Sequence, residues 1–357
     1  MTGKLGKFTT VGTNLRDLST WRKALIPLSW VYGVITDLRN LAYDRSLFQI
    51  DKPACKVISV GNLTVGGTGK TPMIEFLTRT LLDRHFVAIV SRGYGRKTRG
   101  VYIAGSQSTA AEIGDEPLQF FRKFKEQVPV VVAEKRILGA TAVEKNYPQT
   151  DMILLDDALQ HRSIYRDYDI LLTDYNRPFY EDHPFPAGNL RERRRGARRA
   201  DLIVVTKCPS HLTPTQKEDI KIRIRQYSRP DCPVIFSTIR YGAPQPYSGS
   251  ASPNAFSTIA GLSGIAQNQS FEQYLRQSYP LTDFFGFPDH HDYSDSDLVR
   301  TGITQNPKLA LITTEKDRVK LQPLADGLKI ADRCFYIPIE VEFNAHDLAI
   351  LMQLISR

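Results

Sequence analysis

The sequence has few of the features that mark secreted, zinc-binding or membrane-spanning proteins. Its four cysteines are scattered without a CxxC pair, so neither a disulfide framework nor a zinc site is expected, and a reducing cytoplasm fits. Residues 1–20 lack the order of charged, apolar and small residues that makes a secretory signal. The stretch Ala24–Thr36 has no charged residue, but it is shorter than the ~20 residues that cross a bilayer. No internal repeat or low-complexity tract is present.

What the sequence does contain is an excess of positive charge on a globular composition. The chain has 357 residues, of which 41% are hydrophobic, and its length favours two domains. A net charge of +9 indicates an anionic partner: a nucleic acid, a phosphorylated metabolite or a membrane surface. The arginine-rich segment 190–199 contains no aromatic residue on which a base could stack, so we expect no nucleic-acid partner.

One glycine-rich segment, Val57–Ile74, is typical of a phosphate-binding loop. A β-branched run leads through glycines into a predicted helix, where backbone N–H groups and the helix dipole favour a nucleotide phosphate. The strict pattern has glycine where this chain has Thr64, and the alternative is a glycine loop with an accidental GKT. The predicted ATP-binding residues are Thr64, Val65, Gly66, Gly67, Thr68, Gly69, Lys70 and Thr71.

Strand-like and helix-like segments alternate after this loop, which predicts a mainly parallel sheet flanked by helices. The strands are expected at 86–90, 128–132, 152–155, 169–173, 202–205 and 234–236, and helices at 73–84 and 136–145. Asp156 and Asp157 end one strand, where a P-loop enzyme has its Walker B acid near Mg²⁺. The fold class is therefore α/β and P-loop NTPase-like.

A second, smaller α/β domain is expected near the C-terminus. Residues 241–254 are rich in Pro, Gly and Ser and read as a linker, and a new strand-helix pattern follows. We therefore divide the chain into a tail with a helix at 1–48, a P-loop core at 49–240 and a C-terminal lobe at 255–357.

The N-terminal helix carries an apolar stripe. Its members follow three/four spacing: Leu28, Val31, Ile35, Leu38 and Ala42. One interpretation is an amphipathic helix in the membrane interface, and the other is an ordinary helix facing the core. In the first case Trp30 and Tyr32 would sit at headgroup level, and the residues facing anionic lipid would be Arg22, Lys23, Arg39 and Arg45.

Eight motifs in order resemble the tetraacyldisaccharide 4′-kinase family, the lipid A 4′-kinases of Gram-negative bacteria. They are PLSWVYG at 27–33, VGNLTVGGTGKTP at 60–72, SRGYGRK at 91–97, GDEP at 114–117, DDALQHR at 156–162, PAGNLRE at 186–192, FPDHH at 287–291 and TEKD at 314–317. The resemblance runs from about residue 25 to the C-terminus, and the family's loop commonly has threonine at the position of Thr64. The chain departs from it at Ala158, where glycine is usual, at Asn189, where proline is usual, and in a degraded segment at 264–268.

The resemblance implies transfer of the ATP γ-phosphate to the 4′-hydroxyl of a tetraacyldisaccharide 1-phosphate. It implies that Asp115 takes the hydroxyl proton and that His290 orients Asp115, with His291 as the less favoured candidate. Lys70 would neutralise the phosphates. The implied Mg²⁺-binding residues are Thr71, Asp156, Asp157 and Glu192, and those facing the lipid substrate are Gln160, His161 and Arg191.

A substrate with four acyl chains remains in the bilayer, so the resemblance favours the interfacial reading of the N-terminal helix. It implies a peripheral protein on the cytoplasmic face of the inner membrane of a Gram-negative bacterium, bound to an anionic surface. The sequence leaves the oligomeric state open.

Two rival functions remain at this point. A membrane-associated partitioning ATPase has the related loop KGGxGKT, but its signature lysine is replaced here by Val65. A nucleic-acid-binding protein is supported only by net charge and the arginine-rich segment, without a recognition motif.

Overall fold

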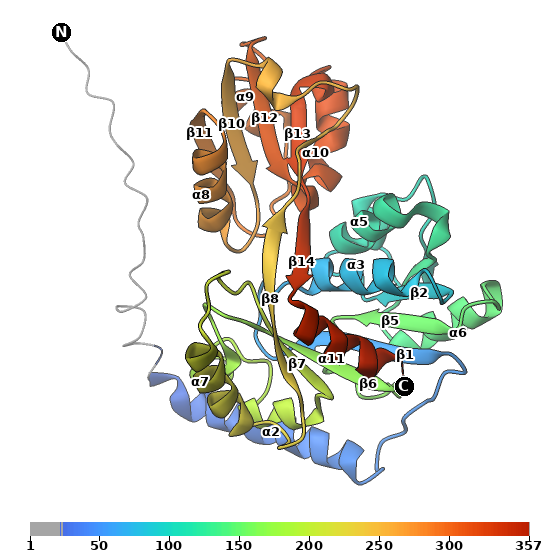
Figure 1. Cartoon of the computed structure of the whole chain (residues 1–357). Helices are drawn as coiled ribbons and strands as arrows, with labels where there is room; N and C mark the ends of the chain where they lie inside the picture. The colour runs from blue at the N-terminus through green and yellow to red at the C-terminus, as the bar shows by residue number, and fades with distance from the viewer. Residues whose placement is uncertain (1–21, 23, 357) are drawn as a thin grey trace.

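The computed structural model describes Arg22 and residues 24–356, arranged as a larger α/β core and a smaller lobe (Figure 1). Within these residues the core has a nine-stranded sheet and the lobe a five-stranded sheet. The predicted fold class is confirmed. Lys23 and the predicted tail at 1–20 lie outside the described residues.

The core sheet is parallel except at its two edges. Its order is β14-β8-β7-β6-β1-β5-β2-β4-β3. The parallel strands are β1 (Lys56–Asn62), β2 (Val87–Ser91), β4 (Val130–Val132), β5 (Met152–Asp156), β6 (Tyr168–Asp174), β7 (Leu202–Thr206) and β8 (Val234–Tyr241), and the antiparallel edges are β3 (Tyr102–Ile103) and β14 (Ile339–Phe343). Central strands are buried on both faces, which explains their continuous apolar runs.

Helices cover this sheet and complete its hydrophobic core. They are α3 (Lys70–Leu81), α4 (Ala110–Ile113), α5 (Asp115–Phe124), α6 (Arg136–Asn146) and α7 (Pro214–Arg225), with short 3₁₀ turns at Lys125–Gln127, Phe179–Glu181 and Arg194–Arg199. Met73 and Leu77 of α3 pack against Ile58 and Leu154 of the central strands. This burial fixes α3 directly behind the predicted phosphate loop.

The smaller lobe repeats the α/β arrangement. Its sheet has the order β11-β10-β12-β13-β9. The bounds are β9 (Gln245–Pro246), β10 (Thr258–Ser263), β11 (Leu281–Gly286), β12 (Leu309–Thr314) and β13 (Cys334–Ile337), with helices α8 (Asn268–Ser278), α9 (Asp295–Arg300) and α10 (Glu315–Gly327) and 3₁₀ turns at Pro253–Ala255 and Ala331–Arg333. Leu262 and Leu311 lie in its core.

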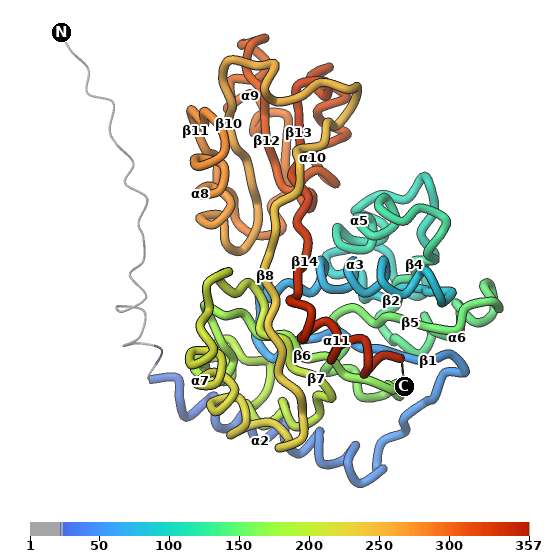
Figure 2. The backbone as a smooth tube through the Cα atoms, viewed as in Figure 1, coloured from blue at the N-terminus to red at the C-terminus, as the bar shows by residue number. Residues whose placement is uncertain are grey.

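Two strands, rather than one coil linker, connect the parts. β8 and β14 pair antiparallel, with Tyr241 opposite Ile339, and run side by side between core and lobe (Figures 1 and 2). Of the predicted linker 241–254, Gln245–Pro246 joins the lobe sheet instead. The predicted lobe boundaries also differ from the topology, because β14 joins the core sheet and α11 (Ala345–Ile355) packs on it. Local composition cannot reveal such a returning chain.

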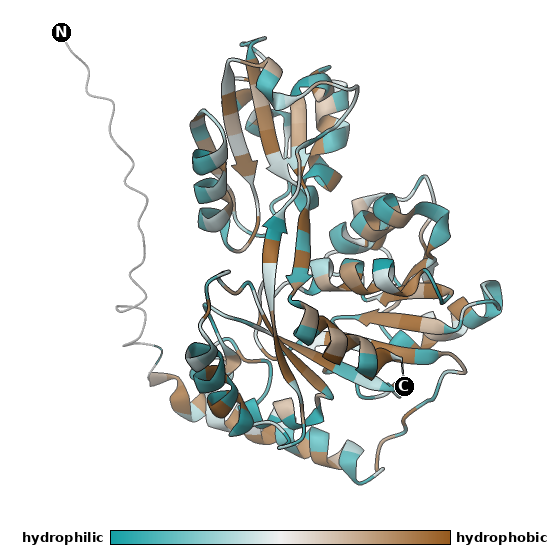
Figure 3. Ribbon diagram, in the orientation of Figure 1, coloured by the Kyte–Doolittle hydropathy of each residue, from teal (hydrophilic) through white to brown (hydrophobic). Residues whose placement is uncertain are grey.

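Helix α2 (Ile26–Asp44) lies along the base of the core (Figures 1 and 3). Its apolar stripe is exposed. Trp30 is 70% exposed, and Ile35 and Leu38 are each 61% exposed. The core-facing alternative is therefore wrong for this stripe. Among the described residues, no helix is long and apolar enough to cross a membrane.

The opposite, polar side of α2 attaches the helix to the core. Asp37 forms ion pairs with Arg193 and Arg195 of the arginine-rich segment. The Tyr32 hydroxyl donates a hydrogen bond to the backbone oxygen of Arg191 at 2.8 Å, so this ring faces protein rather than the predicted headgroup level. Because the polar side of α2 faces the core, the apolar stripe has no partner within the described residues.

Candidate active site

The predicted phosphate loop has the expected geometry. It follows β1, and its last residue, Gly69, is the N-cap of α3 with φ 86°. Gly66 also has a positive φ, 108°, which favours glycine. The Asn62 side chain holds the loop by donating to the Thr64 backbone oxygen at 2.7 Å and to the Thr68 hydroxyl at 2.8 Å. The loop is thus preorganised around a helix N-terminus.

A cavity of about 350 Å³ lies between this loop and the C-terminal lobe. The core contributes Gly67–Thr71 to its wall, and the lobe contributes residues from α8 and α10 and the loop before α8. Its apolar part is formed by Ile239, Tyr241, Ile265, Phe271, Ile337 and Ile339. A polar end at a phosphate loop and an apolar end beyond it fit a nucleotide.

Thr64, Val65 and Gly66, which the sequence also assigned to ATP, do not line this cavity. Thr64 is buried and bridges to Leu190, and the Val65 N–H donates to the Asn189 backbone oxygen at 2.8 Å. Thr64 and Val65 attach the start of the loop to the neighbouring segment.

Acidic side chains gather beside Lys70. Asp157 lies 3.7 Å from the Lys70 ammonium, and the pKa of Asp157, which burial alone would raise, is lowered by Lys70 and Arg191. Asp156 is buried and accepts from the Ser91 hydroxyl at 2.9 Å. Burial, and then the charges of Glu116 and Asp157, raise the pKa of Asp156 to about 7. A cation bound at the loop would therefore be stabilised by these carboxylates.

This donor set fits Mg²⁺ held jointly with a substrate phosphate. The second oxygen of Asp156 is buried and has no hydrogen-bond partner among the described residues. Thr71 contributes a hydroxyl, which donates to Glu116 at 3.3 Å. No group of three or more His, Cys, Asp or Glu side chains in the described part of the chain could hold a metal by itself. Mg²⁺ typically takes one or two carboxylates together with substrate phosphates and water.

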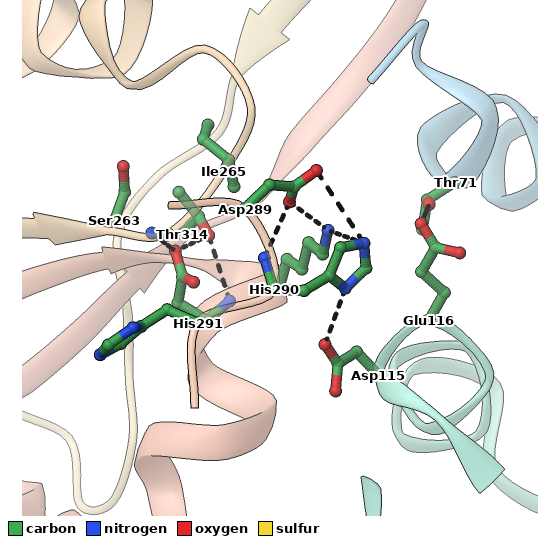
Figure 4. A network of polar contacts seen from close by, with 12 residues as sticks. Thr71, Asp115, Glu116, Ser263, Ile265, Asp289, His290, His291 and Thr314 are labelled. Carbon is green, nitrogen blue, oxygen red and sulfur yellow. Dashed lines mark hydrogen bonds and ion pairs between the residues drawn. The ribbon is translucent and has the colours of Figure 1, made fainter. Parts of the chain in front are cut away.

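Asp115 and His290 meet across the two parts of the molecule. Asp115 begins α5 in the core, and its Oδ2 lies 3.2 Å from Nδ1 of His290 in the lobe (Figure 4). Lys320 of α10 lies 2.9 Å from the same oxygen. Burial alone would raise the pKa of Asp115, but hydrogen bonds from His290 and Lys320 lower it. The carboxylate is therefore ionised at neutral pH.

His291 has a different place from His290. Its ring stacks on Phe287, and Nε2 lies 3.3 Å from Asp297 within the lobe. Figure 4 shows His290 facing Asp115, while Glu116 and Thr71 lie on the core side of the same gap. The predicted contact between Asp115 and His290 is present, and its chemical role stays a prediction.

The residues predicted to face the lipid substrate lie between Asp157 and helix α2. Arg191 donates two hydrogen bonds of 2.8 Å to Asp157. Gln160 donates to Glu192 at 3.0 Å, and its backbone oxygen accepts from Arg39 of α2 at 2.6 Å. Burial, and then nearby arginines, lower the pKa of His161 to about 3, so this imidazole is neutral.

Glu192 contacts both the core and helix α2, and its predicted role in binding Mg²⁺ stays a prediction. Its two carboxylate oxygens accept hydrogen bonds from Arg199, Gln160 and Asn40. Like Asp156 and Asp157, Glu192 does not line the cavity. Burial alone would raise the pKa of Glu192, but Arg199 lowers it. Its contacts join α2 to the core rather than to the phosphate loop.

The sequence analysis assigned no role to several residues of the site. Glu116 belongs to the GDEP motif but had no assigned role, although it contacts Thr71. Lys316 and Lys320 belong to the TEKD segment and its next turn, which carried no assigned role. Lys207 donates to the Gly67 backbone oxygen and to Asp174 beneath the loop. Lys207 and Lys316 share one signal, since each follows within two residues the end of a strand, β7 or β12, that ends at the cavity.

Comparison with known proteins finds one family along nearly the whole chain. The sequence profile described as tetraacyldisaccharide-1-P 4′-kinase, LpxK, matches residues 21–356. The tetraacyldisaccharide 4′-kinase of Cytophaga hutchinsonii is 39% identical over 322 residues, covering 89% of this chain and 90% of the relative. That of Flavobacterium johnsoniae is 38% identical over 330 residues, covering 91% and 94%. The crystal structure of LpxK from Aquifex aeolicus in complex with ATP is 30% identical, with a TM-score of 0.75, covering 95% of this chain and 99% of that one.

Proposed function

Because the chain belongs to the tetraacyldisaccharide-1-P 4′-kinase family and is a kinase of lipid A biosynthesis, we propose that it phosphorylates the 4′-hydroxyl of a tetraacyldisaccharide 1-phosphate. The phosphoryl donor is ATP. The observation that carries the proposal is the cavity between the phosphate loop and the lobe. Its wall includes Glu116 and Asp289, the chain neighbours of Asp115 and His290, which meet across core and lobe. The rival partitioning ATPase and nucleic-acid-binding protein lack comparable support.

In the proposed reaction, Lys70 and the backbone of the loop bind the triphosphate. Thr71, Asp156 and Asp157 would hold Mg²⁺, which would supply positive charge against the negative charge of the phosphates. The acceptor oxygen forms a bond to the γ-phosphorus, the bond from that phosphorus to the leaving oxygen of ADP breaks, and the hydroxyl proton passes to Asp115. An ionised carboxylate suits this role, and a weak base suffices where the transition state is loose.

The disaccharide is proposed to lie on the side of Asp157 that faces helix α2. His161 is neutral, so it can donate or accept a hydrogen bond without adding a positive charge to the site. The planar guanidinium of Arg191 suits the 1-phosphate of the substrate. It now donates to Asp157, and in the complex it would donate to both groups. Gln160 and Glu192 fix this segment against α2.

The direct test is phosphoryl transfer by the full chain. Purified protein, γ-labelled ATP, Mg²⁺ and the tetraacyldisaccharide 1-phosphate in mixed micelles should yield a labelled lipid bisphosphate. ATP hydrolysis without labelled lipid would contradict the proposal and favour an ATPase switch.

We also propose that α2 binds the anionic cytoplasmic face of the inner membrane, as a peripheral attachment that lets the acyl chains stay in lipid. The support is the exposed apolar stripe on a helix whose polar side is already held by the core. Apolar side chains at an interface gain free energy by leaving water, and nearby basic residues add attraction to anionic lipid.

Replacing both Ile35 and Leu38 by glutamate is expected to lower binding to phosphatidylglycerol vesicles by at least about tenfold. Both side chains are exposed, so the fold should be unaffected. Co-sedimentation measures the bound fraction. The matched control is Ile222→Glu on α7, where an isoleucine is 53% exposed away from the stripe. Unchanged pelleting of the double variant would refute the membrane role of α2. Removing residues 1–48 is a less specific test, because it also removes the contacts of Asp37 and Tyr32 with the core.

A further inference from the structure

Three lysines line the cavity, and one of them comes from the C-terminal lobe. Lys70 belongs to the phosphate loop, and Lys207 is bound to Asp174 and to the backbone beneath that loop. Lys316 lies in the first turn of α10, on the opposite wall. The reaction described above assigns no role to it.

The hydrogen bonds of Lys316 leave part of its capacity free. Its ammonium donates to Asp289 Oδ1 at 2.8 Å and lies 3.3 Å from Nε2 of His290. Nε2 of His290 also lies 3.9 Å from Asp289 Oδ2, farther than from Lys316. An ammonium has three N–H donors and no acceptor, so Nε2 of a neutral His290 ring accepts the shorter bond. The ring proton is then on Nδ1 and is donated to Asp115. The third N–H of Lys316 has no partner among the contacts of the described residues.

Acidic side chains around Lys316 keep its ammonium charged in the cavity wall. Its side chain is only 21% exposed, and burial alone would lower its pKa. The carboxylates of Glu116, Asp289 and Asp115 instead raise the pKa of Lys316, so the ammonium stays charged. Glu116 also accepts from the Thr71 hydroxyl, which places this negative charge next to the loop. A buried cation therefore faces the place where a triphosphate would bring further negative charge.

Contacts between α5 and α10 hold this lysine in position. Lys123 of α5 bonds Glu75 at 2.6 Å and Glu315 at 2.7 Å, which joins α3, α5 and the first residue of α10. Arg122 donates to the Val319 backbone oxygen at 3.3 Å. These contacts hold the start of α10, and with it Lys316, against the core.

We propose that Lys316 binds the γ-phosphoryl group of ATP from the lobe side, opposite Lys70, through the N–H that its present partners leave free. This proposal rests on the kinase function proposed above, and it makes charge stabilisation of the transferring group dependent on lobe position. It also makes Lys316 the residue that holds His290 in the tautomer that donates to Asp115. A lysine on each side would share the charge that develops on the phosphoryl oxygens.

The test compares nucleotides with and without a γ-phosphate. In Lys316→Met, the affinity for a non-hydrolysable ATP analogue should fall about tenfold while ADP affinity stays within about twofold, since a charged hydrogen bond to the γ-phosphate is lost. The kcat of lipid phosphorylation should fall about 100-fold. Lys316→Arg should restore the preference for the ATP analogue over ADP, because it keeps the charge.

Lys308→Met, an exposed lysine of the same lobe, is the matched control and should leave both nucleotide affinities unchanged. Equal affinities of Lys316→Met and the wild type for both nucleotides, or an equal loss for both, would overturn the role of Lys316. If Lys316→Met does not fold, the same titrations on Lys316→Gln decide the question. Failure of the wild type to label the lipid would count against the proposed acceptor only, because nucleotide binding is measured without it.

Discussion

Asp115→Asn is expected to lower the kcat of lipid phosphorylation by about 10³-fold while ATP affinity changes by less than about twofold. Asparagine keeps the size of the side chain but cannot take the hydroxyl proton. The carboxylate it replaces is held ionised by His290 and Lys320, so the loss should be present at neutral pH. Steady-state kinetics with saturating ATP and a separate nucleotide titration distinguish turnover from binding.

The matched control is Asp283→Asn, an exposed aspartate on β11, which should keep wild-type kcat. His290→Ala should show a smaller but related defect, because its Nδ1 orients Asp115. A near-normal kcat for Asp115→Asn would exclude this residue as the base.

Lys70→Met is expected to lower kcat/KM for ATP by about 10³-fold or more and to weaken ATP binding measurably. Its ammonium lies at the first residue of α3, within the cavity wall and beside Asp157. Without it, the triphosphate would meet the acidic cluster with less compensation. Isothermal titration gives the affinity, and the transfer assay gives kcat/KM.

Lys135→Met serves as the control, because Lys135 is exposed before α6 and lies outside the cavity. Both parameters should match the wild type in this variant. If Lys70→Met bound and used ATP as well as the control does, the loop could not be the phosphate site.

Local signals in the sequence were sufficient for the parts of the fold that depend on neighbouring residues. The β-branched run of β1 and the glycines before Lys70 predicted a strand, a tight loop and a helix, because each requirement falls on successive residues. Asp156 and Asp157 were placed correctly at a strand end for the same reason. The continuous apolar runs likewise predicted that the parallel strands are buried on both faces.

Features that join distant segments were not predictable in this way. The chain returns to the core through β14, so the lobe boundary drawn from a Pro, Gly and Ser-rich segment was only approximate. Glu192 ends the PAGNLRE motif, and the sequence did not predict that its carboxylate also contacts Asn40 of helix α2. Tyr32 follows the spacing of an interfacial aromatic but bonds Arg191.

Lys316 illustrates the same limit at the site itself. Its importance depends on the distance between α10 and the phosphate loop, which are separated by most of the chain. The TEKD segment was recognisable, but no spacing within it shows that the lysine shares a wall with Lys70. Only the packing of α10 on α5 reveals that relation.

The most direct measurement is a crystal structure of the full chain with Mg²⁺ and a non-hydrolysable ATP analogue. The account predicts the triphosphate on the loop ending at Lys70, with Lys316 at the γ-phosphate and the Asp115 carboxylate near enough for one acceptor hydroxyl to lie between. An Asp115 side chain turned away from the γ-phosphate, or a triphosphate bound elsewhere, would contradict it.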